Sequence, residues 1–163
     1  MALLPVTEAL QRLLDDVEPL PAETVPLHEA FERVLAEPVT ALRTQPPFDA
    51  SAMDGYAVRA TDLARTPGRL SVIGTAPAGH GFTGMVGEGQ AVRIFTGAPL
   101  PAGADTIVIQ ENVRDLGEGQ IEVLEPVQHG RHIRRAGLDF RTGDRLLDRG
   151  RVLDAAALSL VAC

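Results

Sequence analysis

The clearest pattern of apolar and polar positions lies near the start of the chain, and it predicts an amphipathic helix over Thr7–Val17. Thr7 is suited to cap this helix, and Glu8 lies in its first turn, where a negative charge is favourable. The apolar positions recur at helical spacing and form one stripe, made of Ala9, Leu10, Leu13, Leu14 and Val17. Pro19 and Pro21 follow, so the helix should end before them.

Two further helices are expected. The first is short and covers His28–Arg33, with Ala30, Phe31 and Val34 facing inward. The second begins at Asp154 and is apolar nearly all round up to the last residues of the sequence. A helix of that kind needs cover on most sides. We therefore expect the chain to belong to a longer protein.

Between these helices the pattern changes to short runs rich in β-branched residues, separated by turns that contain glycine and proline. Such spacing predicts a compact, mostly antiparallel β unit. The expected strands are Tyr56–Val58, Leu70–Thr75, Ala91–Phe95, Thr106–Gln110 and Gln120–Leu124. A further hairpin is expected within Gly137–Val152.

These elements predict a mainly β chain of the α+β class in two parts. Residues 1–45 and 137–163 would form one discontinuous domain of helices and a hairpin. Residues 46–136 would form an inserted β lobe. A length of 163 residues is sufficient for two small domains of this kind.

Composition excludes several classes of function. The net charge is −7, no lysine is present, and aromatic residues make up 4% of the chain, so a nucleic-acid-binding surface is not expected. The single cysteine, Cys163, excludes a disulfide framework and fits a reducing compartment. The sequence has no signal peptide and no apolar run of about 20 residues, so we expect a soluble, cytoplasmic protein without membrane contact.

The segment around Asp54 is the main candidate for chemistry. Asp49, Ser51 and Asp54 lie within six residues, after two prolines and before Gly55. Carboxylates of this kind can ligate Mg²⁺ or act as a general base, and the glycine allows a close approach of the backbone. The same residues also suit an Asp-rich turn whose side chains bind their own backbone. The residues alone leave both interpretations open.

Four blocks of sequence resemble one known family in order and spacing. They are FDASAMDGYAVRATDL from Phe48, RIFTGAPLP from Arg93, GADTIVIQE from Gly103 and IRRAGLD from Ile133. Together they are similar to the MoeA and gephyrin E-domain family, the molybdopterin molybdenumtransferases. The opening helix also fits, so the resemblance covers the whole chain.

The resemblance implies a fold of coiled, bifurcated antiparallel sheets and an enzymatic function. Family members transfer molybdate to adenylylated molybdopterin and release AMP, with a divalent cation such as Mg²⁺. They are homodimers whose cleft lies between the β lobe of one subunit and a C-terminal α/β domain of the other. That domain is not in this sequence, so the 163-residue chain alone is expected to be inactive. The alternative is a non-catalytic binding or scaffold module of the gephyrin type.

The resemblance also assigns candidate site residues. The catalytic candidates are Asp54, Thr96 and Asp139, and the substrate-binding candidates are Ser51, Arg134 and Arg135. Asp54 is in addition a possible metal ligand. Each has a structural alternative, such as a turn cap for Thr96 or an exposed ion pair for Asp139.

Three positions depart from the family pattern. Leu138 replaces the usual Glu, His132 replaces the usual Asn, and Phe95 replaces a common Met. The first change lowers the negative charge expected beside Asp139.

Overall fold

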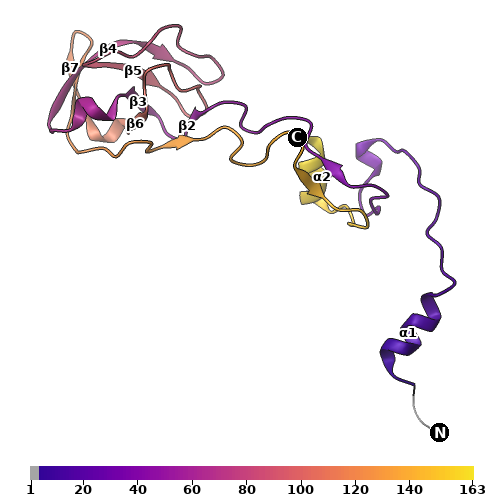
Figure 1. The fold of residues 1–163 in the computed structure, drawn as a ribbon. Coiled ribbons are helices and arrows are strands. Elements are labelled where there is room, and N and C mark those ends of the chain that lie inside the picture. Colours follow the sequence, from indigo (N-terminus) through magenta and orange to yellow (C-terminus); the bar gives the residue numbers. More distant parts are fainter. Residues whose placement is uncertain (1–3) are drawn as a thin grey trace. The chain divides into compact units, whose positions relative to one another are not determined.

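A computed structural model describes residues 4–163 as a mainly β chain with two α-helices. Its contacts divide the chain into two units (Figure 1). One is the β unit Thr40–Leu146, and the other ends at Val39 and resumes at Leu147. These boundaries lie six to ten residues from the expected ones, 45/46 and 136/137.

The first helix, α1, covers Val6–Leu14 and is shorter than the expected Thr7–Val17. It begins after Pro5, without a side-chain cap, so the expected capping role of Thr7 is wrong. Asp15 follows its last residue directly, where a negative charge opposes the helix dipole and favours an early end. None of its residues is buried, and Leu10, Leu13 and Leu14 of its apolar stripe are exposed.

The helix expected over His28–Arg33 is only a 3₁₀ turn, Leu27–Glu29. Glu32 has φ 61°, which lies outside the right-handed helical region and ends any continuation. Ala30 is buried as expected, whereas Phe31 and Val34 are 55% and 60% exposed, so their inward orientation was predicted wrongly.

The last helix, α2, covers Ala155–Ala162 and confirms the helix expected from Asp154. The Asp154 carboxylate caps it by accepting a hydrogen bond from the Ala157 N–H at 2.8 Å. Ala157 packs with Ala30 and Leu153 in the small core of this unit. None of the helices in residues 4–163 is long and apolar enough to span a bilayer.

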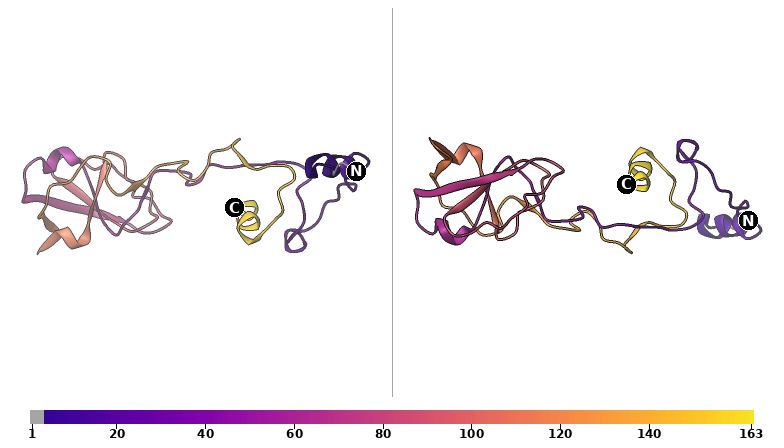
Figure 2. Two further views of the ribbon diagram at one scale, coloured as in Figure 1. Left: turned by 90° about the horizontal axis from the view of Figure 1, so that it is seen from below. Right: turned by 90° about the horizontal axis from the view of Figure 1, so that it is seen from above.

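The β unit contains a six-stranded sheet in the order β6-β3-β5-β4-β8-β7 (Figure 1). Its strands are β3 Gly55–Val58, β4 Gly68–Ala76, β5 Gln90–Ile94, β6 Thr106–Ile109, β7 Val113–Gly117 and β8 Gln120–Val123. All neighbours are antiparallel except β4 and β5, which are parallel. Figure 2 shows the strands of this unit running at different angles to one another, as they do in a strongly twisted sheet. The expected mainly β, α+β class with coiled sheets is confirmed.

Two pairs of short strands complete the fold. β1 Val39–Thr40 pairs with β10 Arg145–Leu147, and β2 Ala50–Ser51 pairs antiparallel with β9 Ile133–Arg134. The hairpin expected within Gly137–Val152 is therefore wrong, because β10 finds its partner far away in the sequence. Two 3₁₀ turns, Ala60–Leu63 and Gln110–Asn112, follow β3 and β6.

Around β3, β5 and β6, both faces of the large sheet are buried. Neighbouring residues of one strand, such as Ala57 and Val58 on β3, point into two different apolar clusters. Ile107 and Val108 on β6 divide in the same way. Burial on both faces explains why these strands are continuous apolar runs. Asp54 and Thr96 lie just outside the apolar runs of β3 and β5.

Candidate functional site

The pairing of β3 with β5 brings Asp54 and Thr96 together. Asp54 immediately precedes β3, and Thr96 lies in the turn that follows β5, which runs antiparallel to it. The Thr96 backbone N–H donates to Asp54 Oδ1 at 2.8 Å, and the Thr96 hydroxyl donates to the same oxygen at 2.7 Å. Two of the three expected catalytic residues are thus in direct contact.

These two hydrogen bonds favour the charged form of Asp54. They hold the pKa of its carboxyl below the ordinary value, with the Thr96 backbone bond as the main cause and the hydroxyl bond next. The Arg93 charge acts in the same direction more weakly. Asp54 is therefore an anion at neutral pH, suited to accept hydrogen bonds or ligate a cation.

A second aspartate, Asp49, holds the chain that follows β9. Its carboxylate accepts a hydrogen bond from Arg135 Nη1 at 2.6 Å and one from the Ala136 N–H at 2.8 Å. The Ala136 bond is the main reason that the pKa of Asp49 is lowered, and the Arg135 bond is the next. Arg135, expected to bind substrate, is thus already in an ion pair, with 55% of its side chain exposed.

Ser51 lies in a different environment from the one its expected role requires. It is fully buried, and its hydroxyl donates to Met53 O at 2.6 Å. Its backbone N–H donates to Ala98 O, and its carbonyl accepts from the Gly97 N–H, both at 2.9 Å. These contacts make Ser51 a support of the Asp54 turn, and substrate binding by Ser51 stays a prediction.

Arg134 is the last residue of β9, and Asp139 lies in the segment that follows this strand. Arg134 is exposed and stands opposite Ala50 in the β2–β9 pair, so it neighbours the segment that leads to Asp54. Asp139 is also exposed, and its backbone N–H donates to Gln45 O at 3.0 Å. Within residues 4–163, no hydrogen bond joins its carboxylate to Asp54 or Thr96.

Sequence reasoning did not single out Arg93. Its guanidinium donates to Gly55 O at 3.0 Å and to Gln110 Oε1 at 2.6 Å. It also lies over the Tyr56 and Phe95 rings, 5.0 and 4.8 Å from their centroids. The available signal was a charged residue inside the otherwise apolar run Ala91–Phe95, three positions before Thr96.

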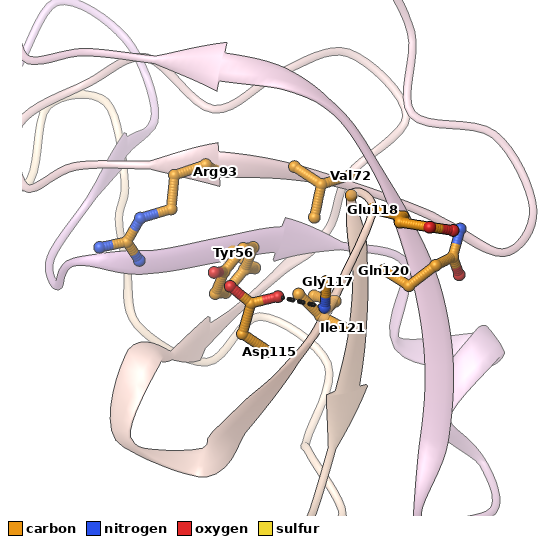
Figure 3. Close-up of a pocket in the computed structure, with 9 residues that line it drawn as sticks. Tyr56, Val72, Arg93, Asp115, Gly117, Glu118, Gln120 and Ile121 are labelled. Carbon is orange, nitrogen blue, oxygen red and sulfur yellow. Dashed lines mark hydrogen bonds between the residues drawn. The ribbon is translucent and has the colours of Figure 1, made fainter.

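A separate cavity of about 280 Å³ opens on the six-stranded sheet (Figure 3). Tyr56, Val72, Arg93 and Asp115 are among its lining residues, and neither Asp54 nor Thr96 is. The Asp115 carboxylate accepts the Gly117 N–H at 2.8 Å, as Figure 3 shows. Residues 4–163 contain no cluster of three or more His, Cys, Asp or Glu that could hold a metal ion.

The fold and the site define a class of protein: a β unit with a coiled sheet, which presents an ionised aspartate held by a Thr-Gly turn. A family model described as "MoeA N-terminal region (domain I and II)" matches residues 4–163. The chain belongs to this family.

Known proteins agree with this assignment. The chain is 41% identical to the "Molybdopterin molybdenumtransferase" of Synechococcus elongatus, over 98% of this chain and 41% of the relative. It is 35% identical to the protein of that name in Staphylococcus aureus, over 98% of this chain and 39% of the relative. The crystal structure of the "molybdopterin biosynthesis moeA protein" from Pyrococcus horikoshii OT3 superposes with a TM-score of 0.91 at 38% identity. That match covers 99% of this chain and 44% of the other. The chain therefore spans about two fifths of the length of its relatives.

Proposed function

We propose that this chain is the N-terminal region of a molybdenum insertase of molybdenum-cofactor biosynthesis. The full-length protein would transfer molybdate to adenylylated molybdopterin and release AMP. The proposal includes the homodimer and the cytoplasmic location that the family resemblance implies. It also includes a following α/β domain that would supply the other wall of the cleft.

The observation that carries the proposal is the Asp54–Thr96 contact. Within a chain that matches the family over residues 4–163, the carboxylate is fixed by two hydrogen bonds on one oxygen, Oδ1. The turn is partly exposed, so a substrate can reach it. A fixed anion whose position does not depend on substrate is preorganised for electrostatic work.

Asp54 fits the role of a single carboxylate ligand to Mg²⁺. Both Thr96 hydrogen bonds fall on Oδ1, and Oδ2 accepts none from the described residues. Mg²⁺ usually binds one or two carboxylates and completes its octahedron with water and substrate phosphates. When bound, the cation would balance the charge of the phosphoanhydride. The chain's own contribution is to keep Asp54 ionised and in place.

Arg134 would contribute positive charge beside this anionic substrate. Its guanidinium suits planar, bidentate contacts with phosphate or molybdate oxygens. Arg135 has a different contribution, because its ion pair with Asp49 ties the segment after β9 to the residue that precedes β2. The proposed roles of Thr96 and Asp139 are to orient Asp54 and to add a second carboxylate, respectively.

The test is an insertion assay with purified adenylylated molybdopterin and molybdate, read by AMP release and by formation of the molybdenum cofactor. We expect activity in the full-length protein and none in the 163-residue chain alone. The Asp54→Asn variant should lose about 100-fold or more of the activity, the scale expected when a charged group acting in the transition state is removed.

A matched control is Asp115→Asn, because Asp115 is also an exposed aspartate that holds a turn N–H, that of Gly117. It should keep full activity. AMP release by the chain alone would show that it needs no second domain. If a folded Asp54→Asn variant keeps full activity, then Asp54 is only a turn residue. The Asp54–Thr96 contact would then no longer support the proposal.

A further inference from the structure

Arg93 contacts residues on either side of the Asp54 turn, as its hydrogen bonds show. It projects from β5, and its two hydrogen-bond acceptors are the Gly55 carbonyl on the neighbouring strand β3 and the side chain of Gln110, which follows β6. Because β3 lies between β5 and β6, the guanidinium bridges the ends of all three strands.

These contacts form a closed ring with the backbone of Asp54. The Gln110 N–H donates to the Asp54 carbonyl at 3.1 Å, and the Gln110 side chain accepts from Arg93 Nη2 at 2.6 Å. Arg93 Nη1 donates to the carbonyl of Gly55, the residue that follows Asp54, at 3.0 Å. The two peptide carbonyls at and after Asp54 are thus held through one guanidinium.

Two aromatic rings fix the guanidinium itself. Its carbon lies 5.0 Å from the Tyr56 ring centroid and 4.8 Å from that of Phe95. Both distances are within the range of cation–π attraction. Figure 3 shows Arg93 and Tyr56 extending from neighbouring strands of the sheet. Phe95 precedes Thr96, so the same contact also reaches the turn that binds the Asp54 carboxylate.

We propose that Arg93 is a positioning residue, which holds the backbone of the Asp54 turn so that the carboxylate stays on Thr96 in the reaction proposed above. This inference rests on the proposed function only for its catalytic consequence. Its structural part, that Arg93 orders the Asp54 turn, stands on the contacts alone.

The geometry requires arginine specifically. A lysine keeps the charge, but its ammonium is a point donor on a flexible stem and lacks the planar fork that reaches two acceptors while lying against rings. Arg93→Lys should therefore behave like Arg93→Gln. If charge alone mattered, the lysine variant would resemble the wild type.

The first measurement is amide hydrogen exchange by NMR on the 163-residue chain. Arg93→Gln and Arg93→Lys should each speed exchange at Thr96 and Gln110 about tenfold, the effect of losing one charge-assisted hydrogen bond. The Ile107 amide, bonded to Arg131 O in the same sheet, serves as an internal reference and should not change. The matched control is Arg69→Gln, because Arg69 is an exposed arginine of the sheet, paired with Glu122.

The second measurement is steady-state kinetics in the full-length protein. Arg93→Gln should lower kcat about tenfold or more with little change in KM, the typical cost of removing a group that orients an active-site ligand. In an Asp54→Asn background the same change should have no further effect, because Arg93 acts through Asp54. A merely structural role would give additive losses instead.

The outcomes separate the two proposals. Unchanged exchange at Thr96 and Gln110 in both Arg93 variants, or additive kinetic losses, would overturn the positioning role. Faster exchange in a full-length protein that shows no insertion activity would support the positioning role and refute the proposed function.

Discussion

Gly55 directly follows Asp54 and lies closer to the neighbouring strand than any side chain would permit. A Cβ added there would lie 2.0 Å from Val108 O and 3.0 Å from Ile109 Cα. The φ of Gly55 is not in the left-handed region, so the restriction comes from contact and not from backbone conformation. The change Gly55→Ala therefore tests how closely β3 must approach β6.

The size of the effect follows from these distances. To reach the 3.0 Å below which Cβ contacts are essentially never seen, the two backbones must separate by about 1 Å. Overpacking of this kind costs about 1–3 kcal/mol. The same movement stretches the bond from the Gln110 N–H to the Asp54 carbonyl beyond hydrogen-bonding range, which adds about 1 kcal/mol. We expect a total loss of about 2–4 kcal/mol, or a fall in Tm of about 4–16 °C for a chain of this length.

The assay is thermal unfolding followed by circular dichroism, with Gly81→Ala as the matched control. At Gly81 the nearest atoms to an added Cβ belong to Pro99, at 3.8 and 3.9 Å, and its φ is also outside the left-handed region. That variant should be neutral or gain up to about 1 kcal/mol. If both variants unfold at the wild-type temperature, the close approach of the two strands does not limit residue 55, and the reasoning is refuted.

Three further predictions concern the carboxylates of Asp49, Asp54 and Asp154. Asp49→Ala should lower the free energy of unfolding in urea by about 1–2 kcal/mol, because it removes two charge-assisted hydrogen bonds. The carboxylate is about one third exposed, so solvent weakens both bonds. An unchanged urea midpoint would contradict this prediction. Asp154→Ala should cost about 0.5–2 kcal/mol by uncapping α2, whereas Asp154→Asn should cost less. The pKa values of Asp49 and Asp54 are lowered on folding, so their contribution is complete above the unfolded-state pKa and is lost as the pH falls through the folded-state pKa. Urea midpoints should therefore fall below about pH 4, and less steeply in Asp49→Asn; equal slopes would contradict this origin.

The strands of the large sheet could be predicted from sequence because their apolar runs are long enough to be distinctive. Leu70–Thr75 lies inside β4, and Thr106–Gln110 contains β6. β7 was missed because it is an edge strand with mostly exposed side chains, so it lacks an apolar pattern. The two-residue strands β2 and β9 were also missed, since so short a pairing is set by the surrounding tertiary contacts and leaves no periodicity.

Part of the candidate site was predictable and part was not. The resemblance identified Asp54 and Thr96, but only the pairing of β3 with β5 shows that they touch. The burial of Ser51 could not be predicted, because a serine in an Asp-rich turn is usually exposed. Arg93 was missed for a related reason: its partners are backbone and amide carbonyls and two rings, which no spacing in the sequence reveals.

The hydrogen bonds around the Asp54 turn connect residues that are very far apart in the chain. Thr96 is 42 residues from Asp54, and Arg135 is 86 residues from Asp49. Closing such loops costs chain entropy before any contact repays it, so non-local contacts of this kind form slowly. The turn can thus reach its final geometry only after the large sheet has brought its strand ends together. We expect substitutions in the turn to accelerate unfolding while leaving the rate of folding nearly unchanged.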